Sequence, residues 1–150
     1  MIVEGYQFTH VADLAPLRTA DASPQAFMPQ GRYDNRRELP LNRFGAGPFC
    51  KFTIPNIYRK PGVYLLVAGA DIRYVGECAN LSERFNAGYG NISPRNCFRG
   101  GQETNCRLNS LVYQAAFSGE KLTLHFHGTP DYKAVEVKLR LALRAPWNRV

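Results

Sequence analysis

The chain lacks the sequence patterns that build zinc sites, disulfide frameworks or membrane spans. Its four cysteines are widely spaced with no Cys-x-x-Cys pair, and it has only three histidines, so no zinc site is expected. No apolar run approaches the roughly 18 residues that a membrane span needs. The amino terminus has no basic region followed by an apolar stretch. We therefore expect a cytoplasmic protein with reduced, mostly packing thiols and no membrane partner.

Acidic residues are scarce relative to basic ones. Asp and Glu total 12 against 19 Lys and Arg, which gives a net charge of +7. This surplus makes a polyanion a natural partner, although many basic proteins bind none in particular. The 150 residues suit one domain, or a compact domain of about 90 residues with an appendage.

Two tyrosine tripeptides stand out among the residues that are present. They are Gly62-Val63-Tyr64 and Tyr74-Val75-Gly76. Alternating apolar residues predict strands over 63–68 and 72–77, joined by the turn residues 69–71, and so a β-hairpin. On adjacent strands the two tyrosines are expected to share one face. The competing interpretation is that strands favour tyrosine and turns favour glycine.

The remaining elements follow from periodicity and capping residues. Helices are predicted over 79–87, 104–119 and 131–144, and a third strand over 121–128. Residues 1–60 show little sustained periodicity and are predicted to be an irregular extension, with a brief helix over 9–17 and a strand over 49–54. The element order from residue 61 onward is β-β-α-α-β-α, which predicts an α/β (α+β) fold.

Glu136 lies on or beside the apolar stripe of the last predicted helix. It is three and seven residues from Leu139 and Leu143. An unpaired carboxylate there is costly, so it needs a cation or strong donors. A salt bridge to Lys133 or Arg140 across one helical turn is one explanation, and a divalent metal is the other.

The two tripeptides are followed along the chain by Arg84, Glu136 and Asn148. This order resembles the signature of the GIY-YIG nucleases, a family that cuts phosphodiester bonds. The resemblance covers residues 61–150 and implies a small three-stranded antiparallel sheet flanked by helices. In many family members a His or Tyr follows the arginine by about four residues; Gly88 occupies that position here, and Tyr89 is the neighbouring candidate. The residues that carry the resemblance are Gly62, Tyr64, Tyr74, Gly76, Arg84, Glu136 and Asn148.

The resemblance also implies roles for these residues. Glu136 would hold one Mg2+ or Mn2+, and Tyr64 would orient or deprotonate the attacking water. A free phenol titrates near a pH of about 10, so positive charge from Arg84 and the metal would assist it. Tyr74 would bind the phosphate or the water, and Asn148 would position Glu136 or the substrate backbone. No small-molecule cofactor is implied.

Two polar stretches carry residue types that grip phosphates, read base edges or stack on bases. One belongs to the extension, and the other is the long loop after Tyr89 with the helix start that follows it. Each has the alternative explanation of an exposed surface loop. The predicted nucleic-acid-binding residues are Arg32, Arg36, Arg37, Arg43, Arg95, Asn96, Arg99, Gln102, Asn105 and Arg107.

The sequence therefore predicts a metal-dependent, site-specific DNA endonuclease, acting on single-stranded or duplex DNA. The domain organisation expected is an extension over 1–60, for DNA recognition or packing, and a nuclease-like domain over 61–150. A catalytically inactive nucleic-acid-binding module of the same fold is the alternative. A protein-interaction domain with an incidentally basic surface is a third hypothesis. Strand preference and oligomeric state stay open.

Overall fold

The computed structural model describes residues 1–33 and 39–149, which form a mixed α+β structure with antiparallel sheets and three α-helices. The predicted α/β (α+β) class is confirmed at this level. Two units share the chain: the first holds Met1–Leu14, Ile54–Arg84 and Lys121–Val150, and the second holds Ala15–Thr53 and Phe85–Glu120. Each unit takes residues from both sides of residue 60. None of the described helices has the length and apolar character of a membrane span.

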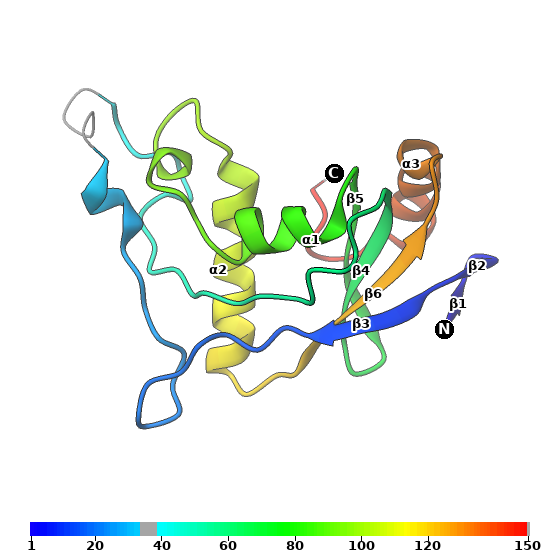
Figure 1. The fold of residues 1–150 in the computed structure, drawn as a ribbon, viewed down its shortest axis with the longest axis horizontal. Helices are drawn as coiled ribbons and strands as arrows, with labels where there is room; N and C mark the ends of the chain where they lie inside the picture. The colour runs from blue at the N-terminus through cyan, green and yellow to red at the C-terminus, as the bar shows by residue number, and fades with distance from the viewer. Residues whose placement is uncertain (34–38, 150) are drawn as a thin grey trace. The chain divides into compact units, whose positions relative to one another are not determined.

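The first unit contains a four-stranded antiparallel sheet. Its strands lie in the order β3 (Thr9–Asp13), β6 (Leu122–Gly128), β4 (Gly62–Ala68) and β5 (Asp71–Cys78) (Figure 1). The prediction of β4, β5 and β6 is confirmed, and β4 and β5 form the predicted hairpin. The expected number of three strands is wrong, because β3 adds a fourth. A separate short pair, β1 (Ile2–Val3) and β2 (Tyr6–Gln7), precedes it.

The fourth strand replaces the helix predicted over residues 9–17. β3 pairs with β6, with Thr9 opposite Phe126 and Asp13 opposite Thr123. Val11 is buried. The apolar residues of this segment therefore belong to a strand whose partner lies far along the chain. Pairing with β6 gives the backbone its hydrogen bonds, whereas a short isolated helix is only marginally stable in water.

One face of the sheet packs against α3 (Tyr132–Leu143), which matches the predicted helix over 131–144. Odd-numbered residues of β4 point to this side, and all seven residues of β4, which lies between β6 and β5, are buried. This core consists of Phe8, Val63, Leu65, Val67, Val75, Val135, Leu139 and Ala145. The even-numbered side of β4 and β5, which carries both tyrosines, is the opposite face.

The second unit is built around α2 (Glu103–Phe117), with the short helices η1 (Pro29–Arg32), η2 (Phe85–Tyr89) and η3 (Pro94–Cys97). η2 is a π-helical turn that follows directly on α1 (Leu81–Arg84) of the first unit. The strand predicted over 49–54 is absent apart from an isolated bridge between Phe27 and Phe49. The core contains Phe49, Ile92, Cys97, Phe98 and Cys106.

A buried asparagine joins two segments of this unit through hydrogen bonds to their backbone. Asn109 on α2 accepts a hydrogen bond from Cys50 N at 3.0 Å. Its Nδ2 donates to Cys50 O at 2.8 Å and to Tyr89 O at 2.7 Å. These bonds satisfy buried backbone groups of two segments that have no ladder partner, as buried polar groups require. All four cysteines of the chain are buried and free of disulfides.

Candidate functional site

The two tyrosines of the hairpin lie together on one face of the sheet. Tyr64 on β4 pairs with Gly76, and Tyr74 on β5 pairs with Leu66, so the tyrosines are diagonal neighbours. Their ring centroids are 6.1 Å apart, at an interplanar angle of 37°. The expectation that both share a face is therefore confirmed.

Gly76 is required by the position of the Tyr64 ring. A Cβ atom at Gly76 would lie 2.3 Å from Tyr64 Cζ and 2.4 Å from its hydroxyl oxygen. Gly62 has a similar constraint, since a Cβ there would lie 2.3 Å from His127 O. The Tyr64 side chain fills the space over Gly76 and is only 1% exposed. Both glycines of the tripeptides thus have packing roles rather than turn roles.

Arg84 ends α1, whose start is fixed by a buried serine. Ser82 Oγ donates to Pro55 O at 2.8 Å and accepts from Tyr58 N at 3.0 Å. Burial raises the pKa of Cys78 to about 11, and the charge of Arg84 opposes this rise. Cys78 lies two residues after Gly76 on the tyrosine side of β5. The helix therefore brings the Arg84 charge to the end of the strand that carries Tyr74.

Glu136 lies on α3 between core residues and is only 9% exposed. Its Oε1 is 3.5 Å from Nη1 of Arg140, one helical turn later. Burial raises the pKa of Glu136, the charge of Arg140 opposes this rise, and the carboxylate of Glu77 adds to it. Glu77 directly follows Gly76 on β5, the strand against which α3 packs.

Sequence reasoning missed Glu77. The available signal was a carboxylate immediately after Tyr74-Val75-Gly76, opposite Val63 in the hairpin register. Such a residue is close to the tyrosines in sequence, but only the packing of α3 on β5 brings it near Glu136.

Asn148 holds the free edge of β5. Its Oδ1 accepts from Val75 N at 2.9 Å, and its Nδ2 donates to Val75 O at 2.8 Å. The neighbouring Trp147 N donates to Arg73 O at 2.8 Å. The segment after α3 thus runs along β5 as a further strand would. Asn148 acts on the backbone of the second tripeptide, a role that the resemblance did not suggest.

Few protein donors for a divalent metal lie near Glu136 in the described part of the chain. Within residues 1–33 and 39–149, no three His, Cys, Asp or Glu side chains gather into a metal cage. Mg2+ does not need such a cage, because it binds through one or two carboxylates and keeps waters and substrate phosphate oxygens as its other ligands. The carboxylates available here are Glu136, which is ion-paired with Arg140, and Glu77, whose charge acts on it.

Tyr89, the candidate for the fifth polar group, belongs to the second unit. It is buried, with its ring 5.1 Å from that of Phe85. Its carbonyl accepts the Asn109 hydrogen bond described above. Tyr64, Tyr74, Arg84, Glu136 and Asn148 all lie in the first unit.

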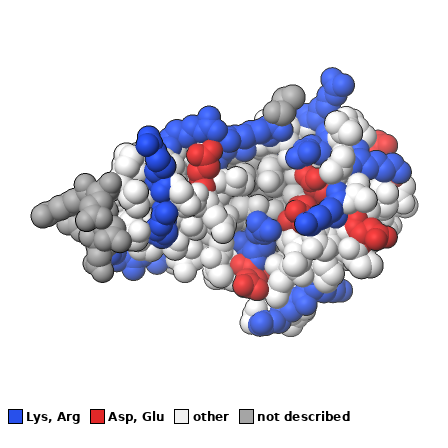
Figure 2. Space-filling model, turned by 90° about the horizontal axis from the view of Figure 1, so that it is seen from above, with Lys and Arg blue, Asp and Glu red and all other residues white. Residues whose placement is uncertain are grey.

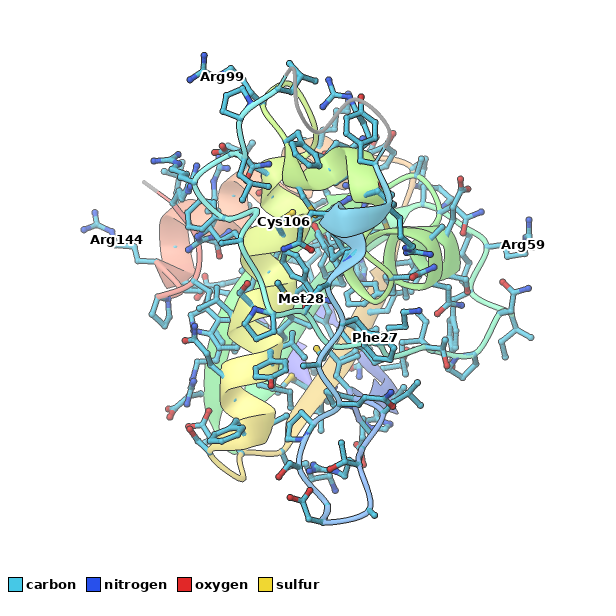
Figure 3. All side chains as sticks on the ribbon, turned by 90° about the vertical axis from the view of Figure 1, so that its left-hand side faces the viewer. Phe27, Met28, Arg59, Arg99, Cys106 and Arg144 are labelled. Atoms are coloured by element: carbon cyan, nitrogen blue, oxygen red, sulfur yellow. The ribbon has the colours of Figure 1, made fainter. Side chains whose placement is uncertain are left out.

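The described arginines among the predicted nucleic-acid-binding residues lie in the second unit and differ in the contacts that their side chains make. Arg43 is ion-paired with Glu103, with Nη2 and Oε1 3.0 Å apart. Arg95 donates to Arg99 O at 3.0 Å and lies over the Tyr33 ring at 5.8 Å. Arg32 and Arg99 are exposed, and Arg99 points away from the ribbon (Figure 3). Arg107 is half-buried on α2. Arg36 and Arg37 lie outside the described residues.

The amides of the same prediction hold the loop together. Asn96 Oδ1 accepts from Gln102 N at 3.2 Å, and Gln102 Oε1 accepts from Asn105 Nδ2 at 3.2 Å. Asn96 O also accepts from Asn42 Nδ2 at 2.6 Å. Basic side chains lie over much of the face seen in Figure 2, with acidic ones between them. Among the predicted residues, the arginines are thus better placed than the amides to meet a polyanion.

Comparisons of the chain with protein-family models, with curated proteins and with solved structures gave no match.

Proposed function

We propose that the chain is a metal-dependent DNA endonuclease of the GIY-YIG type. The observation that carries the proposal is the position of Glu77. It follows the tripeptide whose glycine supports Tyr64, and it acts electrostatically on Glu136. α3 packs on one face of the sheet and the tyrosine pair lies on the other, and both adjoin the end of β5 at Gly76 and Glu77, where we place the proposed phosphodiester site.

In the proposed reaction each residue has one task. Glu136 would hold the divalent ion, which would supply Lewis-acid chemistry at the scissile phosphate. Tyr64 accepts or orients the proton of the attacking water, and Arg84 supplies positive charge that favours the developing anion. Tyr74 donates a hydrogen bond to the phosphate. Asn148 keeps Val75, between Tyr74 and Gly76, at its place on the strand edge.

The test begins with randomised single-stranded and duplex DNA, incubated with Mg2+ or Mn2+, and sequencing of the cut ends. Glu136→Gln and Tyr64→Phe should each lower the cleavage rate by about 100-fold or more. Glu4→Gln, which changes an exposed glutamate of the same unit, should leave it unchanged. Electron paramagnetic resonance of Mn2+ should show binding by the unaltered chain and weaker binding by Glu136→Gln. Cleavage without metal, or full activity of Glu136→Gln, contradicts the proposal.

A nucleic-acid-binding module without catalysis is the second candidate. The observation in its favour is the burial of the Tyr64 ring, because a phenol 1% exposed has to become accessible before it can reach a water. Salt-dependent binding of DNA without a single cut, in Mg2+ and in Mn2+, would select this candidate.

A further inference from the structure

The end of α3 borders a cavity that none of the residues discussed as DNA-binding enters. Its volume is about 570 Å³. Three arginines contribute to the lining, two from α3 and its C-cap and one from the segment that follows. The lining residues are Arg140, Leu141, Arg144, Ala145, Asn148 and Arg149.

The charge of this region favours an anion. Residues 132–149 contain five basic side chains, at 133, 138, 140, 144 and 149, and one acidic side chain, Glu136. Arg140, Arg144 and Arg149 are all exposed. Guanidinium groups are suited to phosphate because they donate two parallel hydrogen bonds to its oxygens.

A simpler explanation for cations at this place is the negative end of the helix macrodipole. It does not account for Arg144. That residue is the C-cap and has φ 48° and ψ 48°, in the left-handed region where glycine is usual and other residues are strained. Its side chain points away from the ribbon (Figure 3). The strain at this exposed arginine is a reason to look for a task of its side chain.

The cavity also adjoins the Glu136 carboxylate and the strand that carries Tyr74. Arg140 is the ion-pair partner of Glu136. Asn148 bonds to Val75, next to Tyr74. A DNA strand whose phosphates occupied this cavity would therefore lie next to Glu136 and β5.

We propose that this arginine-lined cavity binds backbone phosphates of the DNA next to the bond that is cut. The inference rests on the proposed function, but its test measures DNA binding and not cleavage. Binding of this kind is independent of sequence, and each lost phosphate contact lowers the slope of log affinity against log salt concentration by about 0.7 for single strands and 0.9 for duplex.

The experiment measures fluorescence anisotropy of a labelled oligonucleotide, single-stranded and duplex, over a range of NaCl concentrations without divalent metal. Arg144→Gly and Arg149→Gln should each weaken binding and lower the salt slope by about one contact. Arg59→Gln, at an exposed arginine of the same unit outside the cavity, is the matched control and should leave the slope unchanged. Arg144→Gly should also raise Tm by about 2 °C, because glycine relieves the left-handed strain.

A more stable Arg144→Gly protein that binds DNA more weakly separates a binding role from a structural one. Unchanged slopes in both cavity variants overturn the inference even if the protein cleaves DNA. An equal loss in Arg59→Gln, or no DNA binding at all, also overturns it. If the slopes fall as expected but no cleavage is found with Mg2+ or Mn2+, the cavity assignment stands and the proposed activity fails.

Discussion

A single missing side chain determines where Tyr64 lies. Gly76 leaves room for the phenol ring of Tyr64, and no other residue offers that room without moving the ring. The glycine of the second tripeptide and the tyrosine of the first are therefore one packing unit across two strands. Each residue of this pair constrains the identity of the other.

Gly76→Ala should accordingly destabilise the protein by about 1–3 kcal/mol, as overpacking of a buried site does. Chemical denaturation measures the loss, and any cleavage activity should fall with it because Tyr64 is displaced. Gly128→Ala is the control, since a Cβ there meets its nearest atom at an ordinary 3.7 Å. Equal effects of the two substitutions would show that the tyrosine ring does not set the requirement.

His125 provides a pH-dependent contribution to stability. Its Nδ1 is buried with no partner among the described residues, and its Nε2 is 3.0 Å from Thr123 Oγ1. Burial lowers the pKa of His125, and the charges of His10 and the amino terminus lower it further. The unfolded chain therefore binds the proton more tightly than the folded one, and the free energy of unfolding falls as the pH drops below about 6.5.

His125→Gln removes the titration but keeps a side chain that can bond to Thr123. The decrease in the free energy of unfolding between neutral and mildly acidic pH should be smaller in this variant. Urea denaturation at both pH values measures the difference. An identical pH dependence in the two proteins rules out His125 as the source.

Elements with one clear local pattern could be predicted from the sequence, and β3, whose apolar spacing also fits a helix, could not. The hairpin follows from alternation in β4 and β5 and from turn residues between them. β3 was predicted as a helix because Val11 and Leu14 fit a helical spacing, while its partner, β6, pairs across 117 residues, as between Thr9 and Phe126. In the candidate site, the order of residues indicated the tyrosines and Glu136. The influence of Glu77 and the bonds of Asn148 depend on packing that periodicity does not report.

Asn148→Ala should expose the dependence of β5 on its edge contact. The variant loses both side-chain bonds to Val75 and leaves two backbone groups of a buried residue unsatisfied, at a cost of about 1–3 kcal/mol. Amide hydrogen exchange at Val75 should accelerate. Asn56→Ala, at an exposed asparagine of the same unit, is the control. Unchanged protection of Val75 in Asn148→Ala would show that these two hydrogen bonds are dispensable.

At the scale of the molecule, the net charge of +7 is divided between both units, so DNA affinity should have contributions from each. The second unit offers a clear comparison between two arginines of one loop. Arg95 supports the loop through Arg99 O and Tyr33, whereas the Arg99 side chain points outward.

Arg99→Gln should lower the salt slope of DNA binding by about one contact while leaving Tm unchanged. Arg95→Gln should instead destabilise the protein by about 0.5–1.5 kcal/mol through its lost hydrogen bond. Anisotropy and thermal denaturation together distinguish the two. Normal binding by Arg99→Gln would remove this loop from the DNA interface.

The pairing of β3 with β6 also has a consequence for how the protein is made. β3 leaves the ribosome before its partner β6, which follows 117 residues later between Thr9 and Phe126. At about 5–20 residues per second, that interval lasts roughly 6–23 s. During synthesis β3 therefore has no strand partner until β6 is complete, and an unpaired strand is a template for aggregation. Yield in recombinant expression should depend on chaperones and temperature more than the stability of the finished fold suggests.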